Sequence, residues 1–426
     1  MRRRRSGSAR AARLAARRRR LLAHPGLFLG AGLGTLWCTP MNVVFLSPHF
    51  PPNMWLFCQR LQAQGATVLG IDDAPYDHLR AELRDSLAEY YRVTDLHSLD
   101  ELIRALGWLT HRRGKIDRLE SLNEYWLETD ARLRTEFNIA GLKRDQMDRI
   151  KRKSAMKEVF QRAGVPVARG RVCLTEAETR SFVDEVGFPV IAKPDVGVGA
   201  AKTYRVDDAA ALAGYLSDRP TVEYILEEFL SGDLVSYDGL IDRDGRVVFD
   251  ASITYGMSVL DAVSGGDMTY WLERAIPDDL AAMGRRVAAA FDVTERPFHF
   301  EFFRLPDGRL VALEVNMRQP GGLTVDMWNY ANDADFYRAW AQVMVHGTAD
   351  IAHERPYAVL WAGRKRERTY ALSHDEVMAR FRDLIVHHER VQDVFAAAIG
   401  NEGYILRAPA LEPLRAAAAE IQARAG

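Results

Sequence analysis

Two short segments of the chain combine acidic side chains, an amide and an arginine at regular spacing. HFEFF (299–303) and LVALEVNMRQPGG (310–322) flank the turn-forming run 305–308. Both alternate with the period of two that strands have, so together they predict a hairpin. The alternation places these residues on one face of each strand: His299, Glu301 and Phe303 on the first, and Leu310, Ala312, Glu314, Asn316 and Arg318 on the second. We therefore expect Glu301, Glu314 and Asn316 to converge.

Three converging oxygen ligands predict a divalent-cation site. Two carboxylates are costly to bury unless a cation or hydrogen bonds compensate them. All-oxygen ligation suits Mg²⁺, which also takes ligands from substrate phosphates. The alternative is that both glutamates pair with nearby arginines. His299 shares the face of Glu301, and we favour a packing or hydrogen-bonding role for it over a catalytic one.

A second segment, FPVIAKPDVGVGAAK (188–202), places Lys193 at the end of a predicted strand, before a loop that contains Gly197 and Gly199. Glycines let the backbone approach phosphate oxygens closely, and a lysine adds a fixed positive charge. The segment lacks the GK[ST] of a P-loop and the context of a dinucleotide-binding GxGxxG. On these residues alone, a tight hairpin is an equally good interpretation.

A second lysine position follows from a predicted helix. In SAMKEVFQRAGVP, Ser154 is the expected N-cap, and Gly164 and Pro166 end the helix. Lys153 then lies at the helix mouth, where free backbone N–H groups favour an anion. Lysine is scarce, with eight residues against 49 Arg. A lysine in such a position is therefore a better candidate for a point charge that binds phosphate.

The charge of the chain excludes some classes of function. The 426 residues carry a formal net charge of −1, but residues 1–40 contain ten Arg and no acid, so the remainder carries −11. An acidic body offers no basic face for a phosphate backbone, which predicts no nucleic-acid partner. Its 48% hydrophobic content is enough to bury a large core, which excludes disorder.

The first 40 residues form a basic arm with an apolar run over 21–37. This run is short for a membrane span and broken by a proline and four glycines. A strand pattern begins at Met41, so we expect the fold to start there and 1–40 to be translated upstream sequence, with a targeting arm as the alternative. The rest of the chain has no apolar run of spanning length, which predicts no membrane partner. Three cysteines without a CxxC pair fit a reducing compartment, the cytoplasm.

The elements that must position these side chains begin with a strand–helix–strand unit. Val43–Leu46 and Ala66–Ile71 are predicted strands, Trp55–Gln64 is a predicted helix, and the order implies a small parallel sheet. Further helices are expected near 77–90, 98–113 and 127–137. We divide the chain into a basic arm (1–40), an N-terminal βαβ domain (41–142), a central region with a lid (143–225), a C-terminal lobe (226–345) and a smaller α+β subdomain (346–426).

Taken in this order, the motifs resemble the ATP-grasp superfamily over roughly 41–345, and within it the carboxylate–amine ligase, biotin-carboxylase-like and carbamoyl-phosphate-synthase-like branch. The resemblance implies that Lys153 and Lys193 contact the nucleotide phosphates and that the loop 195–202, with Gly197 and Gly199, covers them. It implies Mg²⁺, or Mn²⁺ in its place, on Glu301, Glu314 and Asn316. Arg318, two residues beyond the amide, is implied to contact phosphate or the reacting acid.

The resemblance also implies a nucleotide-base site. The run YILEEFLSGD (224–233) says little alone, but its Glu227, Glu228, Phe229 and Leu230 match the family's hinge, whose backbone groups hold adenine. The ribose-binding acid would be Asp233 or Asp238, because strict alignment puts Leu234 at that position.

The fold implied is α/β and α+β multidomain: an ATP-grasp fold preceded by a βαβ domain, with ATP between lid and lobe. The activity implied is ATP-dependent activation of a carboxylate as an acyl phosphate, followed by attack of an amine, with Lys153, Lys193 and Arg318 offsetting the charge that develops. The alternatives are phosphorylation of bicarbonate or another carboxylate with a different acceptor, and a nucleotide-binding module without turnover. The partners are then small carboxylates and amines, and a homodimer stays open.

Overall fold

The computed structural model describes residues 40–197, 202–218, 222–257, 262 and 265–425. None of the helices in these ranges is long and apolar enough to cross a bilayer.

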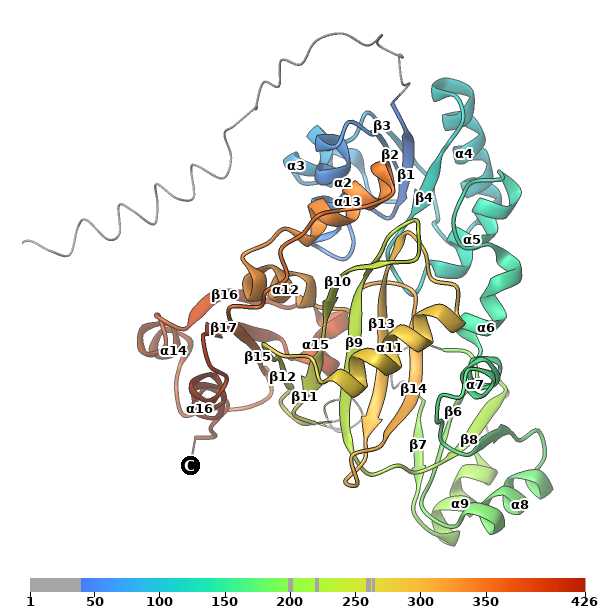
Figure 1. Ribbon diagram of the computed structural model, residues 1–426, viewed down its shortest axis with the longest axis vertical. Coiled ribbons are helices and arrows are strands. Elements are labelled where there is room, and N and C mark those ends of the chain that lie inside the picture. Colours follow the sequence, from blue (N-terminus) through green and yellow to red (C-terminus); the bar gives the residue numbers. More distant parts are fainter. Residues whose placement is uncertain (1–39, 198–201, 219–221, 258–261, 263–264, 426) are drawn as a thin grey trace, which may run out of the picture. The chain divides into compact units, whose positions relative to one another are not determined.

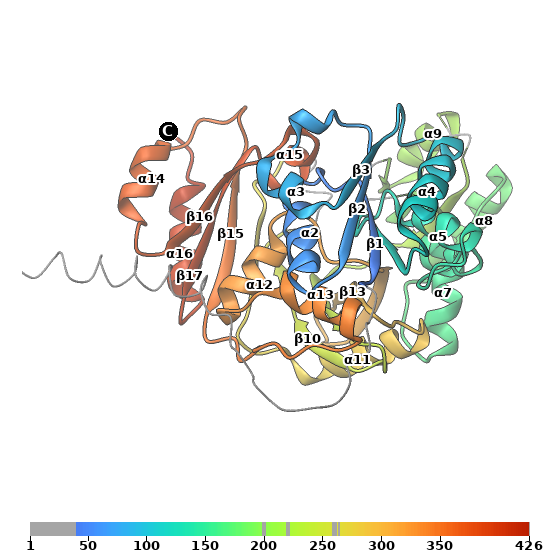
Figure 2. The same ribbon diagram turned by 90° about the horizontal axis from the view of Figure 1, so that it is seen from above.

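A parallel sheet with helices on both faces forms the N-terminal part of the described chain (Figures 1 and 2). Residues of β1 alternate between two cores: Val43 and Phe45 pack with α2, and Val44 and Leu46 pack with α4. The predicted βαβ unit is confirmed. The strand order is β3-β2-β1-β4, with β1 Asn42–Leu46, α2 Met54–Ala63, β2 Thr67–Asp72, η1 Tyr76–His78, α3 Ala81–Ser86, β3 Glu89–Arg92, α4 Leu99–Arg113, β4 Arg118–Glu120 and α5 Leu127–Glu136.

The single helix expected over 77–90 is wrong. Helix α3 covers only part of that range, and β3 follows it and pairs with β2. The reason is tertiary: Tyr90 donates its hydroxyl to the Ala74 carbonyl at 2.6 Å, and Tyr91 packs edge-on against Trp108 of α4. Aromatic residues at a sheet edge fit a pleated, half-buried surface better than a helix.

A small antiparallel sheet, which we call the lid, follows α7. Two helices pack against it around a core that contains Phe182 and Leu212, and α8 begins with a capping box between Thr175 and Glu178. The strand order is β5-β8-β6-β7, and the elements are η2 Arg144–Gln146, α6 Met147–Lys151, α7 Lys153–Arg162, β5 Gly170–Val172, α8 Glu176–Val186, β6 Val190–Pro194, β7 Tyr204–Val206, α9 Ala209–Ser217 and β8 Tyr224–Glu228.

The largest sheet of the described residues has nine strands (Figure 1). Its path is β14-β13-β9-β11-β12-β15-β17-β16, and β10 pairs with β9 off this path. Strands from the range 346–426 therefore continue the sheet that the hairpin begins. The elements are β9 Asp233–Ile241, β10 Val247–Ala251, β11 Ile253–Tyr255, β12 Thr269–Leu272, α11 Asp278–Ala290, β13 Arg296–Arg304, β14 Leu310–Asn316, α12 Thr324–Asn332, α13 Phe336–His346, β15 Ala358–Arg364, α14 His374–Arg380, β16 Ile385–Arg390, α15 Asp393–Ile399, β17 Glu402–Ala408 and α16 Glu412–Ile421.

Helix α11 covers the apolar face of the β9–β14 end of this sheet. It approaches so closely that a Cβ at Gly284 would lie 2.0 Å from the Tyr237 ring, which explains the glycine. Phe298, Phe300 and Phe302 point into the same core. The opposite face of β13 is therefore free to carry its polar residues.

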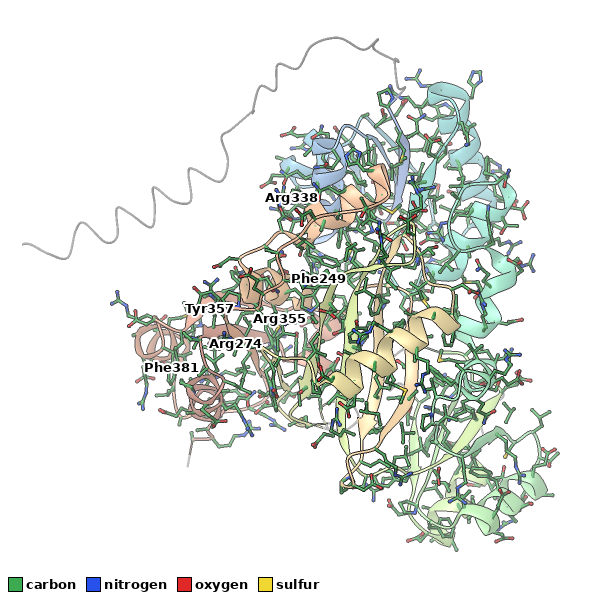
Figure 3. The ribbon with its side chains drawn as sticks, viewed as in Figure 1. Phe249, Arg274, Arg338, Arg355, Tyr357 and Phe381 are labelled. Atoms are coloured by element: carbon green, nitrogen blue, oxygen red, sulfur yellow. The ribbon has the colours of Figure 1, made fainter. Side chains whose placement is uncertain are left out.

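Aromatic side chains join the C-terminal helices to the rest of the fold. Phe249 of β10 packs against Trp328 of α12 and Phe336 of α13 (Figure 3). One turn further along the same face of α13, Trp340 lies edge-on to Phe57 of α2, with ring centroids 5.1 Å apart. Through these contacts, α12 and α13 connect the parallel sheet to the large sheet.

Candidate functional site

The hairpin β13–β14 brings its acids together as predicted. Glu301 lies opposite Glu314 and His299 opposite Asn316 in the antiparallel register, so their side chains share one face. The Asn316 amide Nδ2 donates to Glu314 Oε1 at 3.3 Å. Both glutamates therefore stand side by side on the face away from α11.

One part of the hairpin prediction is wrong. The register shifts between Glu301 and Phe302, so that Ala312 faces Phe302 and Leu310 faces Arg304. Leu310 and Ala312 consequently lie in the apolar core instead of beside the acids. A bulge inserts one residue into a strand and reverses the faces beyond it, and simple alternation cannot anticipate it.

The two hairpin carboxylates differ in electrostatic state. Burial raises the pKa of Glu314, the neighbouring Glu301 raises it further, and Lys153 and Lys193 offset only part of this. Burial also opposes ionisation of Glu301, but His299 outweighs it and lowers the pKa of Glu301. Glu301 is thus stabilised as a carboxylate, whereas Glu314 has too little positive charge around it to offset its burial and the charge of Glu301.

His299 is a fixed cation behind Glu301. Its Nδ1 lies 2.6 Å from Asp238 Oδ1 on β9 and its Nε2 lies 3.0 Å from Glu301 Oε1. Burial disfavours the charged ring, but Asp238 and then Glu301 outweigh it and raise the pKa of His299 to about 10. With both ring nitrogens donating, His299 orients Glu301 through hydrogen bonds, as the sequence analysis favoured.

On the lid, one buried carboxylate is held by two lysines. Glu227 of β8 accepts from Lys193 of β6 at 2.7 Å and from Lys157 of α7 at 2.8 Å. Burial opposes ionisation of Glu227, but Lys193 and Lys157 outweigh it and lower the pKa of Glu227 to about 2. A Cβ at Gly170 would come within 2.9 Å of the Glu227 side chain, so the strand next to this cluster must carry glycine.

Lys153 begins helix α7, one residue earlier than the Ser154 cap predicted from the sequence, and that prediction is wrong. Asp195, just after β6, supplies the cap: its carboxylate accepts from the Ser154 backbone N–H and hydroxyl, both at 2.8 Å. Asp195 also pairs with Arg152 at 2.9 Å. The Lys153 ammonium donates to the Gly197 carbonyl at 3.3 Å, which ties α7 to the start of the glycine loop.

The run that matches the adenine hinge lies at the end of β8. The backbone N–H groups of Glu228 and Phe229 donate to the Arg169 and Pro189 carbonyls. The Glu228 carboxylate pairs with Arg169 at 2.7 Å, and Leu230 follows half-buried. The base contacts implied for this run stay a prediction.

Two further predicted contacts concern the ribose acid and the loop glycines. Asp233 is exposed at the start of β9, opposite Arg304, whereas the alternative ribose acid, Asp238, is buried against His299. Gly197 is described, and Gly199 lies outside the described residues. Their nucleotide contacts also stay predictions.

Arg318 lies beside the hairpin and contacts the N-terminal sheet. Its Nη2 donates to Asn316 Oδ1 at 3.4 Å and its Nε lies 3.4 Å from Glu124 Oε2. Glu124, in the loop after β4, also pairs with Lys151 at 2.6 Å. Burial opposes ionisation of Glu124, but Arg318 and Lys151 outweigh it and lower its pKa.

Sequence reasoning missed three residues of this arrangement. Lys157 is one of the few lysines, and Asp195 lies inside the segment that contains Lys193, so composition and motif position could have drawn attention to both. Glu124 has no motif around it, and only the tertiary structure brings it to Arg318.

Comparison with known proteins identifies the region that contains this site. Residues 186–326 match the family model of the ATP-grasp domain. This part of the chain is an ATP-grasp domain. The match includes Lys193, Glu227, the whole of the β13–β14 hairpin and Arg318, and it confirms the resemblance that the motifs indicated.

Two of the relatives that match by sequence are named as a ligase and a synthase. An L-arginine-specific L-amino acid ligase of Bacillus subtilis is 26% identical over 266 residues, which are 58% of this chain and 63% of that protein. A carbamoyl phosphate synthase large chain of Mycobacterium sp. (strain JLS) is 25% identical over 280 residues, which are 61% of this chain and 25% of that protein. The chain thus spans less than two thirds of the first relative and a quarter of the second.

Solved structures confirm the predicted fold. An L-amino acid ligase from Bacillus licheniformis superposes with a TM-score of 0.68 at 14% identity, covering 89% of this chain and 96% of that one. An ADP complex of N5-carboxyaminoimidazole ribonucleotide synthetase gives 0.65 at 13% identity, covering 89% and 95%. The ATP-grasp fold with a βαβ domain in front of it therefore describes this chain.

Proposed function

We propose that this protein is an ATP-dependent carboxylate–amine ligase. The observation that carries the proposal is the half-buried pair Glu301 and Glu314, with Lys153 and Lys193 close enough for their charges to act on Glu314. Like charges in register on one hairpin are unfavourable unless something positive joins them. A binding module for a nucleotide base has no need of such a pair, so the arrangement favours phosphoryl transfer.

The hairpin residues fit a magnesium ion bound with the nucleotide. Glu301, Glu314 and Asn316 offer the oxygen donors that Mg²⁺ prefers, and the raised pKa of Glu314, caused by burial and by Glu301, is the deficit of positive charge that a cation would fill. When bound, the ion would offset the charge of the phosphates. Mn²⁺ has the same preference for oxygen donors.

The roles of the remaining residues follow from their positions. Lys153, at the start of α7, and Lys193, on strand β6 of the lid, would hold the phosphates of ATP and offset the charge that develops during transfer. The substrate carboxylate oxygen attacks the terminal phosphorus, the bond to ADP breaks, and an acyl phosphate forms. Arg318, held by Glu124, would orient the reacting acid. The amine then attacks the carbonyl carbon, an amide bond forms, and phosphate leaves.

The substrates are proposed from the relatives. The similarity to an L-arginine-specific L-amino acid ligase makes an amino acid the first carboxylate to test, with the amino group of a second one as acceptor. The similarity to carbamoyl phosphate synthase favours bicarbonate as the second candidate. A cytoplasmic location goes with both, since Cys58 is a buried free thiol of the kind that reducing compartments maintain.

The test is a screen for ADP and phosphate release by the full chain, with amino acids and other carboxylates crossed against amines and with products read by mass. We expect release that requires Mg²⁺ and both substrates, and a product mass equal to the two substrates minus water. Release with bicarbonate alone would favour the second candidate. Release that persists unchanged in Glu314→Gln would contradict the assigned site.

A further inference from the structure

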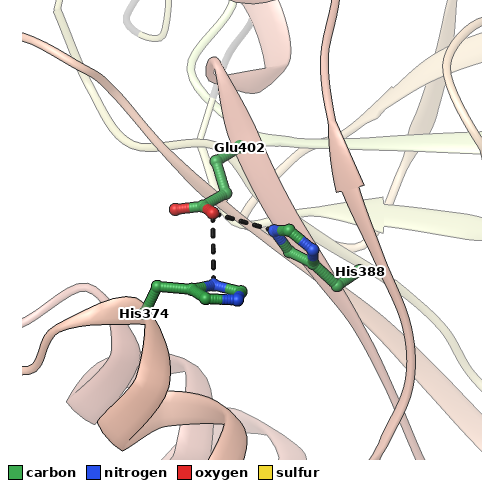
Figure 4. A group of neighbouring side chains, drawn as sticks. All are labelled: His374, His388 and Glu402. Carbon is green, nitrogen blue, oxygen red and sulfur yellow. Dashed lines mark hydrogen bonds and ion pairs between the residues drawn. The ribbon is translucent and has the colours of Figure 1, made fainter.

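Two histidines and a glutamate meet in the range 346–426 (Figure 4). His374 is the first residue of α14, His388 lies on β16 and Glu402 begins β17. Glu402 Oε1 lies 3.2 Å from His374 Nδ1 and 2.8 Å from His388 Nε2. One ligand atom of each side chain lies within 4.8 Å of the others.

The fold positions all three side chains. His388 lies opposite Tyr404 in the β16–β17 register, and Glu402, two residues before Tyr404, shares that face. Ser373 caps α14 through a reciprocal capping box with Glu376, which fixes the position of His374 at the start of the helix. The His374 ring is 4.4 Å from the His388 ring and stacks on Tyr404 at 5.9 Å.

We propose that His374, His388 and Glu402 bind a divalent transition-metal ion of the zinc class. Two imidazoles and one carboxylate are a ligand set that such ions use, with an open position for water. Bond lengths of about 2.0–2.1 Å around a tetrahedral ion place ligand atoms about 3.3 Å apart. The two distances to Glu402 Oε1, 3.2 and 2.8 Å, need to change by only a few tenths of an ångström.

The charges and exposure around the cluster suit an ion. Without one, His388 Nε2 and Glu402 Oε1 share a hydrogen bond at 2.8 Å, and His374 Nδ1 lies 3.0 Å from the Tyr404 hydroxyl. An ion on these two ring nitrogens would take the place of the hydrogen-bonding protons. The side chains are 41%, 22% and 28% exposed for His374, His388 and Glu402, so an ion can enter from solvent. Arg364, in register with Glu402 on β15, donates its Nε to the Ile421 carbonyl.

This site is separate from the nucleotide site. Five strand spacings separate β13 from β17 in the sheet order, or about 24 Å at roughly 4.8 Å each. The ion would link α14 to the β16–β17 end of the large sheet and would stabilise the folded chain. Any ion that binds the folded chain and not the unfolded one raises the melting temperature.

The experiment is a titration of the full chain with Co²⁺, followed by visible absorption, and with Zn²⁺, followed by melting temperature, both with Mg²⁺ in excess to fill carboxylate sites. We expect one Co²⁺ per chain with the spectrum of mixed nitrogen and oxygen ligation, and a rise in melting temperature with Zn²⁺. His388→Ala should weaken binding at least tenfold, since loss of outer-shell partners alone costs about 10–100-fold.

His387→Ala is the matched control. His387 neighbours His388 on β16, so its side chain faces the other side of the sheet, where it pairs with Glu389 at 3.1 Å. This variant should bind Co²⁺ as the parent chain does. Equal affinity in His388→Ala and the parent, or equal weakening in His387→Ala, would overturn the proposal.

The exposed His374 gives a second variant, His374→Ala, if His388→Ala does not fold. Its melting temperature without metal should match the parent, and its rise with Zn²⁺ should be lost. A rise of the parent's size in this variant would equally overturn the proposal.

Discussion

Two glutamates, the buried Glu227 on the lid and the half-buried Glu314 on the hairpin, interact with the same lysine but stand in opposite electrostatic states. Glu227 has Lys193 and Lys157 within 2.8 Å, and they outweigh burial to bring its pKa to about 2. Glu314 has an amide at 3.3 Å and a second carboxylate opposite, and its pKa is raised by burial and by Glu301. The charge of Glu227 is thus compensated by its two lysines, whereas the charge of Glu314 is not compensated by its neighbours.

This difference separates charges that stabilise the fold from charges that take part in the chemistry. A buried carboxylate with two ammonium partners stabilises the native state once formed, because breaking it leaves charges uncompensated. A buried carboxylate without a sufficient partner destabilises the fold and is retained at functional sites. Lys193 belongs to both regions, because it pairs with Glu227 and its charge also acts on Glu314.

The largest effect is expected at the hairpin. Glu314→Gln should lower turnover about 1000-fold or more, because it removes a ligand for the cation and so a source of transition-state charge stabilisation. Stability without nucleotide should be equal or higher, since a neutral side chain of the same shape replaces a carboxyl whose pKa is raised. Phosphate release and melting temperature measure the two effects. A variant that melts well below the parent would show that Glu314 is structural.

The lid glutamate should behave in the opposite way. Glu227→Gln should destabilise the lid by about 3 kcal/mol, because two buried lysines lose their carboxylate. Hydrogen exchange of the β6 and β8 amides measures this locally. Since the pKa of Glu227 is lowered from 4.5 to about 2, its contribution is complete above pH 4.5 and disappears as the pH falls toward 2. A difference between parent and variant that did not shrink in acid would contradict the pairing.

The two lysine partners of Glu227 separate structure from chemistry. Lys193→Met and Lys157→Met should each reduce lid protection by about 1–2 kcal/mol, since each leaves Glu227 one partner. Only Lys193→Met should lower turnover by about 100-fold or more, and Lys157→Met should cost less than tenfold. Equal losses of turnover in both variants would show that Lys157 also contacts the nucleotide.

The smallest effect is a pH dependence. Because Glu314 has a raised pKa, caused by burial and Glu301, a cation must displace its proton. The Mg²⁺ concentration for half-maximal turnover should therefore rise by up to about tenfold per pH unit below that pKa. Glu227→Gln should keep this slope and Glu314→Gln should abolish it. If the slope were lost in Glu227→Gln and kept in Glu314→Gln, Glu227 would be the carboxylate that competes with the cation for a proton.

Much of the site could be predicted because its signals are local. The alternation around Glu301 and Glu314 and the strand end at Lys193 are patterns within ten residues, and the structure places these side chains as expected. The bulge that reverses Ala312 was not predictable, because one inserted residue changes the faces without changing the composition. The same holds for β3, where packing against Trp108 decided the element.

The sequence by itself determined the residue types, their order and the strands that carry them, and with these the domain family. Only the tertiary structure decided which charges neutralise one another: Lys157 with Glu227, Asp195 with the start of α7, Glu124 with Arg318, and His374 and His388 with Glu402. The physical reason is that charges interact through space, over a few ångströms in a buried setting, and most of these partners lie tens of residues or more apart along the chain.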